Sequence, residues 1–163
     1  RNISEYKKSL QEKQALKELY GLSERQMTRY VKEALVMRRA KNVADELVKN
    51  LERRLDNVVF RLAFAKTLAQ SRQIVSHAYF LVNGRPVNIP SFQVKTGDII
   101  TLKENKKKKL IFKDLGVTLK KIQAPDWLSL DKEKLEGKIV RYPSLAEVNP
   151  PIEISLVFEF YSR

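Results

Sequence analysis

The sequence contains no cysteine, which excludes disulfide bonds, a thiolate nucleophile and a zinc site built from cysteines. It has one histidine, His77, and no residue of a suitable type lies near it in the sequence to complete a metal site or a catalytic pair. A Gly-rich phosphate-binding loop is also missing. We therefore expect no catalytic residue, no metal site, no cofactor and no small-molecule substrate.

Long hydrophobic runs are absent as well. Apolar runs such as residues 79–82 are too short to cross a bilayer, and no signal peptide precedes the first expected helix. Together with the lack of cysteine, this pattern is typical of a soluble protein in a reducing, intracellular setting. The chain starts with Arg1 rather than Met, so we expect that the natural N-terminus lies upstream or has been removed.

Acidic residues are scarce relative to basic ones. The chain has 32 Lys and Arg against 19 Asp and Glu, a formal net charge of +13. A charge of this size destabilises the compact state unless a polyanion neutralises it, and nucleic acid is the common polyanion for a basic domain. With 163 residues, of which 43% are hydrophobic, the chain can bury the core of one ordinary domain or of two small ones.

The first 62 residues have the apolar spacing of helices. We predict one helix over residues 6–20, ended by Gly21, and a second that begins at a capping box formed by Ser23 and Gln26. A third, long helix is expected from Asn42 to Leu62. Tyr side chains at apolar positions, Tyr6, Tyr20 and Tyr30, are expected in the core.

The following residues change to the period of strands. A short helix over residues 67–78 precedes a hairpin whose turn is Asn83-Gly84, and residues 99–102 form another strand. Further on, we expect a helix over residues 110–122 and a turn at residues 125–130 with Trp127 buried. The last expected strands are residues 138–142 and 154–161. The four lysines at 106–109 are interpreted as a solvated loop.

The best candidate for a contact with phosphate is the helix over residues 67–78. Residues 51–103 are poor in acids, with 8 Lys and Arg against 3 Asp and Glu. Ile74 and Val75 should face the core, which leaves Arg72, Gln73 and His77 on the opposite side. The alternative interpretation is an ordinary solvated helix face.

Residues 53–102 resemble the S4-type RNA-binding domain, two helices followed by a small sheet. The resemblance rests on residues 54–59, on the helix from Ser71 to His77, on the hairpin at 82–84, on residues 87–91 and on Gly97-Asp98. This resemblance implies binding to structured RNA. It also implies an α+β fold in which two helices pack on a small antiparallel sheet.

A second resemblance covers the rest of the chain. Residues 4–6, 10–14, 16–17, 20–21, 24–26 and 30, with the tail at 135–137, 143 and 157–163, are similar to the family of the fourth protein of the small ribosomal subunit. Departures fall at residues 36–46, 104–124 and 145–153. We expect a helical rRNA-binding domain at residues 1–50 and an S4-type domain with a C-terminal elaboration at residues 51–163.

That family implies a primary binder of small-subunit rRNA, which docks on a multi-helix junction of the 5′ domain and nucleates subunit assembly. The implied partners are the rRNA, neighbouring small-subunit proteins with the fifth among them, and mRNA near its entry path, in a cytoplasmic or organellar ribosome. The family also implies an influence on translational accuracy, and some members repress their own mRNA. The residues that we expect to contact RNA are Lys8, Lys13, Lys17, Arg25, Gln26, Arg29, Arg53, Arg54, Lys66, Arg72, Gln73, His77 and Arg85.

Two other functions fit an S4-type domain. One is an RNA-binding appendage of a pseudouridine synthase, but residues 104–163 are too few for a catalytic domain. The other is a stand-alone RNA binder in stress or quality control, from which the helical segment at residues 1–50 distinguishes this chain. A role on a membrane surface is disfavoured because no helix combines a lysine-rich face with a broad Trp, Phe and Leu face.

Overall fold

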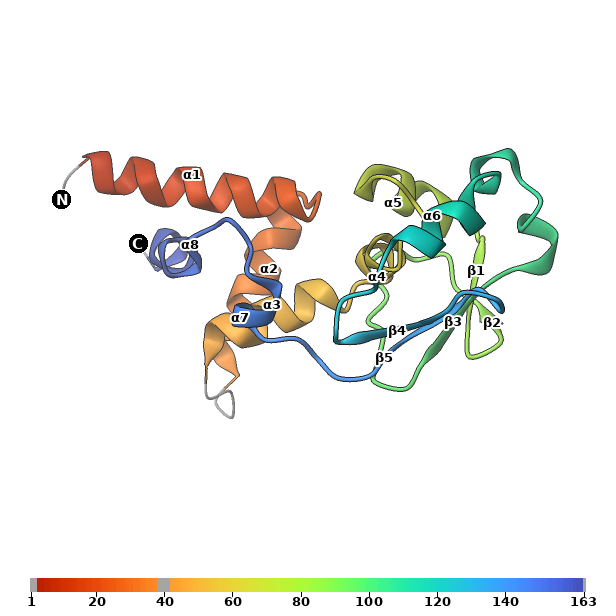
Figure 1. Cartoon of the computed structure of the whole chain (residues 1–163). Helices are drawn as coiled ribbons and strands as arrows, with labels where there is room; N and C mark the ends of the chain where they lie inside the picture. Colours follow the sequence, from red (N-terminus) through yellow and green to blue (C-terminus); the bar gives the residue numbers. More distant parts are fainter. Residues whose placement is uncertain (1–2, 38–41, 163) are drawn as a thin grey trace. The chain divides into compact units, whose positions relative to one another are not determined.

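A computed structural model describes residues 3–37 and 42–162 of the chain (Figure 1). It divides into two compact units, one formed by Arg1–Leu51 with Pro143–Arg163 and the other by Glu52–Tyr142. Residues 38–41, part of an expected variable segment, lie outside the described residues. Within the described ranges, no helix is both long enough and apolar enough to span a membrane.

The described residues of the first unit form helices and the turns between them. In chain order the helices are α1 (Ile3–Leu19), α2 (Glu24–Val36), α3 (Val43–Glu52), α7 (Leu145–Val148) and α8 (Ile154–Tyr161). The predicted capping box is present at the start of α2, where Gln26 N–H donates to Ser23 Oγ at 3.2 Å and Ser23 N–H donates to Gln26 Oε1 at 3.0 Å. Asn42 caps α3 by accepting from Ala44 N–H at 2.9 Å. These caps satisfy donors that would otherwise lack partners at the helix starts.

The C-terminal segment corrects two expectations. Residues 154–161 form a helix rather than a strand, and Pro143–Arg163 belongs to the helical unit rather than to the S4-type domain. Ile154 and Val157 are buried in the same cluster as Leu16 and Met27, and α8 packs on α1. The aromatic and branched residues favoured a strand by composition, but the helical spacing of the buried ones decides the structure. Tyr6 also differs from expectation, because its side chain is exposed.

The expected long helix from Asn42 to Leu62 is interrupted. It ends at Glu52, and α4 (Leu55–Arg61) begins after Arg54, which has an extended backbone with φ −60° and ψ 136°. The backbone there pairs with a distant segment, since Val94 N–H donates to Arg53 C=O at 2.8 Å and Leu55 N–H donates to Phe92 C=O at 2.9 Å. These bonds replace the helical bonds that a continuous helix would make.

The second unit packs helices on an antiparallel sheet. Its strands are β1 (Phe80–Val82), β2 (Arg85–Pro86), β3 (Ile99–Leu102), β4 (Leu128–Asp131) and β5 (Glu136–Ile139), in the order β2-β1-β3-β5-β4. Helices α4, α5 (Leu68–Ser76) and α6 (Leu115–Lys121) lie on one side of this sheet (Figure 1). The predicted hairpin is confirmed: Asn83 and Gly84 both have positive φ, 51° and 79°, as a tight turn of this kind requires.

The segment between β3 and β5 is less regular than expected. The predicted helix over 110–122 consists of a 3₁₀ turn at Leu110–Phe112 followed by α6, and the expected turn at 125–130 continues into β4. Trp127 is buried as predicted. The lysine run at 106–109 is not a simple solvated loop, because Lys107 pairs with Glu104 at 2.6 Å and Lys106 lies over the Tyr79 ring.

Candidate nucleic-acid interface

Helix α5 presents the polar side that the sequence predicts. Ile74 and Val75 are buried, whereas Gln73, Ser76 and His77 are exposed. The helix starts at Thr67, whose side chain accepts from Gln70 N–H at 3.0 Å. The apolar side is therefore fixed against the core, and the polar side is open to a partner. Contact of that side with RNA stays a prediction.

A buried carboxylate anchors Arg72 on this side of α5. Asp56, on α4, is fully buried and accepts a hydrogen bond from Arg72 Nε at 3.2 Å. The same carboxylate accepts from Arg54 Nε at 3.2 Å and from Arg54 Nη2 at 3.1 Å. The helices are further joined because Ser71 Oγ donates to the backbone carbonyl of Asp56. Two guanidinium groups thus share one carboxylate.

The two arginines differ in how far they reach solvent. The Arg54 side chain is 2% exposed, while that of Arg72 is 36% exposed. A buried Arg54 can hold Asp56 in place, but it cannot present its guanidinium to an RNA backbone without a rearrangement. We therefore leave Arg54 out of the proposed interface and keep Arg72.

The remaining predicted residues of this unit lie in different places. Lys66 and Arg85 are exposed, the first beside the start of α5 and the second in β2. Arg53 is partly buried: its Nε donates to Val94 C=O at 2.9 Å, and its guanidinium lies 4.9 Å from the centre of the Tyr142 ring. These contacts orient Arg53 in the fold and leave part of its side chain accessible.

The cations of the helical unit also divide into exposed residues and residues held in the interior. Lys8, Arg25 and Arg29 are exposed, and Gln26 serves as a cap. Lys13 is 5% exposed, pairs with Glu24 at 2.9 Å and lies 4.8 Å from the centre of the Phe160 ring. Lys13 therefore stabilises the packing of α1, α2 and α8, and we leave it out of the interface.

Glu24 is the centre of a polar cluster in the helical unit. It also pairs with Lys17 at 3.4 Å, and Tyr161 Oη donates to it at 2.9 Å. Partial burial acts to raise the pKa of Glu24. The hydrogen bonds from Lys13, Tyr161 and Lys17 and the positive charge of Lys13 outweigh this effect and hold the pKa below its ordinary value. Burial, and then donation to Glu24, raise the pKa of Tyr161. The cluster ties the last helix of the chain to the first two.

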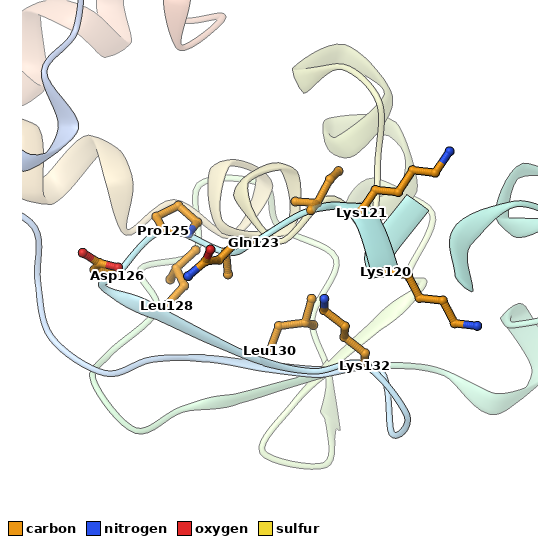
Figure 2. Close-up of a pocket in the computed structure, with 10 residues that line it drawn as sticks. Lys120, Lys121, Gln123, Pro125, Asp126, Leu128, Leu130 and Lys132 are labelled. Carbon is orange, nitrogen blue, oxygen red and sulfur yellow. The ribbon is translucent and has the colours of Figure 1, made fainter. Parts of the chain in front are cut away.

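Sequence reasoning missed a second group of cations. Lys120 and Lys121 at the end of α6 and Lys132 after β4 line one open hollow in the S4-type unit, together with Leu128 and Leu130 (Figure 2). Part of the signal was present as the alternation of Leu128 and Leu130, which places two apolar side chains on one face of a strand, with Lys132 directly after it.

Comparisons with known proteins agree with this architecture. Residues 1–54 match the model of the ribosomal protein S4/S9 N-terminal domain, and residues 53–100 match that of the S4 domain. The chain is 48% identical over 161 residues to the small ribosomal subunit protein uS4 of Persephonella marina, covering 98% of this chain and 78% of that protein. It is 44% identical over 165 residues to the protein of the same name from Herpetosiphon aurantiacus, covering 100% of this chain and 77% of that protein. A uS4 of Neisseria meningitidis is also 44% identical, over 161 residues, with 99% and 77% covered.

Proposed function

The chain belongs to the uS4 family of small ribosomal subunit proteins, and we propose that it binds small-subunit rRNA as a structural component of that subunit. The observation that carries this proposal is the polar side of α5, where Arg72 is held by the buried Asp56 and stands beside exposed Gln73 and His77. A guanidinium held in place by a buried carboxylate is well suited to a phosphate, because less conformational entropy is lost on binding. The role proposed is one of binding and scaffolding, with no catalysis.

The contact is proposed to be made mainly with the RNA backbone. A-form RNA is recognised through its shape, its phosphates and its 2′-hydroxyl groups, and lysines and arginines supply the charge for this. The net charge of +13 and the exposed Lys8, Arg25, Arg29, Lys66 and Arg85 support such a mode. Tyr20, Tyr30 and Trp127 are buried and cannot serve as stacking platforms.

The finer role follows the family resemblance. We propose that the protein docks on a multi-helix junction of the 5′ domain of the rRNA and nucleates assembly, and that it acts in the ribosome beside the fifth small-subunit protein and the mRNA entry path. An influence on translational accuracy and repression of its own mRNA are part of the same proposal. The alternative of a stand-alone S4-domain RNA binder, or of a synthase appendage, is disfavoured by the match of residues 1–54 to a ribosomal protein domain.

A salt titration tests the proposal. The full chain is titrated with an RNA of the 5′-domain junction, and an RNA of equal length and composition with scrambled sequence serves as the control. If about five phosphates or more are neutralised, the logarithm of the binding constant should fall with the logarithm of the salt concentration with a slope of roughly −4 or steeper. A flat titration, or equal affinity for the scrambled RNA, would contradict the proposal.

Both units are expected to contribute. Because residues 143–163 belong to the helical unit, cutting the chain at residue 51 would damage that unit, and full-length variants are the better test. Arg25→Ala with Arg29→Ala removes two exposed charges from the helical unit, and Arg72→Ala removes one from the other unit. We expect each change to weaken binding to the junction RNA. Full affinity in the Arg25/Arg29 variant would restrict the interface to the S4-type unit.

A further inference from the structure

The S4-type unit has an open hollow of about 600 Å³ between the end of α6 and strand β4 (Figure 2). Leu128 and Leu130 form its apolar floor, and Pro125 adds to one wall. Figure 2 shows Lys120 and Lys132 at one end and Asp126 at the other. The hollow is therefore apolar in the middle and charged at its ends, which differs from the wholly polar side of α5.

The three lysines of the hollow are available to a partner. Lys120, Lys121 and Lys132 are exposed, and none of them forms an ion pair with another described residue. Lys120 and Lys121 stand at the C-terminus of α6, where their charges complement the helix dipole. Lys132 has no such role, since it follows the end of β4.

Strand β4 is an edge strand, and its free edge lies beside this hollow. Among the described strands, β4 pairs only with β5. Val140 N–H donates to Trp127 C=O at 2.9 Å, and the register pairs Ser129 with Lys138 and Asp131 with Glu136. In an antiparallel pair every second residue forms the backbone hydrogen bonds to the neighbouring strand, and here these residues are Trp127, Ser129 and Asp131. The N–H and C=O of Leu130 and the C=O of Leu128 therefore point away from β5.

We propose that the outer edge of β4 binds an extended, acidic protein segment, which adds to the sheet as a sixth strand. Its alternate side chains would rest on Leu128 and Leu130, because side chains on one face of a strand repeat every second residue. A carboxylate beyond them would meet Lys132, which follows β4 and lines the same hollow. The charge of the lysines selects acidic side chains at that end. Main-chain hydrogen bonds to Leu130 and Leu128 would fix the register of the added strand on β4.

The hollow suits a peptide better than it suits RNA. Proteins that bind single-stranded RNA stack its bases on aromatic side chains, and the residues that line this hollow include no aromatic one. A duplex presents its phosphates and 2′-hydroxyl groups, which form no favourable contact with the apolar floor of Leu128 and Leu130. This inference concerns a protein partner, and it rests on the proposed function only in that neighbouring ribosomal proteins would be the natural source of the segment.

The test is a titration of the full chain, labelled with ¹⁵N, with three probes. The first is a nine-residue peptide that alternates valine and glutamate, the second has lysine in place of glutamate, and the third is a single-stranded oligouridylate. We expect the acidic peptide to shift the backbone amides of Leu128–Asp131 and the lysine peptide to leave them unchanged. Absence of these shifts at millimolar acidic peptide would overturn the proposal, and stronger binding of oligouridylate at the same amides would assign the hollow to RNA instead.

A matched pair of variants separates a specific contact from general attraction. Lys132→Glu reverses a charge at the hollow, and Lys138→Glu reverses one on the other face of the sheet, where Lys138 pairs across the strands with Ser129 and Ile99. We expect Lys132→Glu to lower the affinity for the acidic peptide about tenfold, and Lys138→Glu to change that affinity by less than about twofold. Equal weakening by both variants would overturn the proposal. Binding of the wild-type chain to the junction RNA is measured in parallel, so that a failure of rRNA binding is seen separately from a failure at β4.

Discussion

Arg72 on α5 donates from Nε to Oδ2 of Asp56 on α4 at 3.2 Å, so the residue best placed to contact a phosphate is itself held by a buried acid. The same carboxylate neutralises the buried Arg54. Stability of the helix pair and orientation of a binding residue therefore depend on one side chain. Variants at the two arginines and at the acid should separate these effects.

Arg72→Ala should weaken binding to the junction RNA by about 1 to 3 kcal/mol, the usual range for an arginine that contacts nucleic acid. It should lower the stability of the S4-type unit by less than about 1 kcal/mol, because the ion pair with Asp56 is partly exposed to water. Arg72→Lys should recover part of the affinity, since it keeps the charge but loses the planar fork. Filter binding and urea unfolding measure the two quantities, with Lys134→Ala as a control that removes an exposed charge elsewhere. If Arg72→Ala unfolds early but binds normally once folded, the residue is structural and the contact side is misplaced.

Asp56→Asn should destabilise the S4-type unit by about 3 to 5 kcal/mol, because it removes the buried carboxylate charge with which the buried Arg54 pairs. Trp127 is the only tryptophan and is buried in the same unit, so its fluorescence during urea unfolding reports on that unit. Asp126→Asn, which changes an exposed carboxylate in the same way, is the control. Equal stability of these two variants would mean that Arg54 finds another partner.

Local signals in the sequence predicted local structure well. The capping box of Ser23 and Gln26 and the hairpin turn at Asn83-Gly84 both depend on neighbouring residues only, and both are present. The apolar side of α5 was predicted from spacing alone for the same reason. In each case the conformation is set by interactions between residues that are only a few positions apart in the sequence.

Features decided by distant residues were not predictable. The break after Glu52 depends on hydrogen bonds from residues 53–56 to residues 90–94, and the helix at Ile154–Tyr161 depends on burial against α1. The interior position of Lys13 likewise results from Glu24 and Phe160, which only the folded chain brings near. Arg54 pairs with Asp56 only two residues away, but both side chains are buried by the fold around them. Charge alone indicated which residue types bind RNA, but it could not tell an exposed cation from a buried one.

Glu24→Gln should lower the stability of the helical unit at neutral pH and have little effect at low pH. The pKa of Glu24 in the folded state lies below its ordinary value of 4.5, so the unfolded state takes up the proton first as pH falls. The stabilisation is therefore fully present above about that ordinary value and is lost as pH falls through the folded-state pKa. The effect should be modest, because the Glu24 side chain is 48% exposed and its ion pairs are screened.

Thermal unfolding of the wild type and of Glu24→Gln between pH 3 and pH 7 measures this difference, and the two curves should converge at the acid end. Glu18→Gln is a suitable control, since it changes an exposed carboxylate of the same unit in the same way. Curves that stay parallel over the whole range would show that the charge of Glu24 contributes nothing to stability.

Gly137→Ala should destabilise the S4-type unit, whereas Gly116→Ala should not. A Cβ at Gly137 would lie 2.9 Å from Leu62 Cδ2 and closer still to Cδ1, and Leu62 is buried with 1% of its surface exposed. Overpacking of this kind costs about 1 to 3 kcal/mol. A Cβ at Gly116, in α6, meets no atom within 4 Å apart from its chain neighbours and the backbone of its own helix. Alanine there should raise stability by roughly 0.5 to 1 kcal/mol through its helix propensity.

The double variant Gly137→Ala with Leu62→Val tests the cause. Shortening Leu62 alone leaves a small cavity, but in the double variant the new methyl group fills part of that space, so the combined loss should be smaller than the sum of the two single losses by about 1 kcal/mol. Urea unfolding followed by Trp127 fluorescence measures all four stabilities in the unit concerned. If the two losses simply add, the close approach of Leu62 to Gly137 is not what requires glycine at that position of β5.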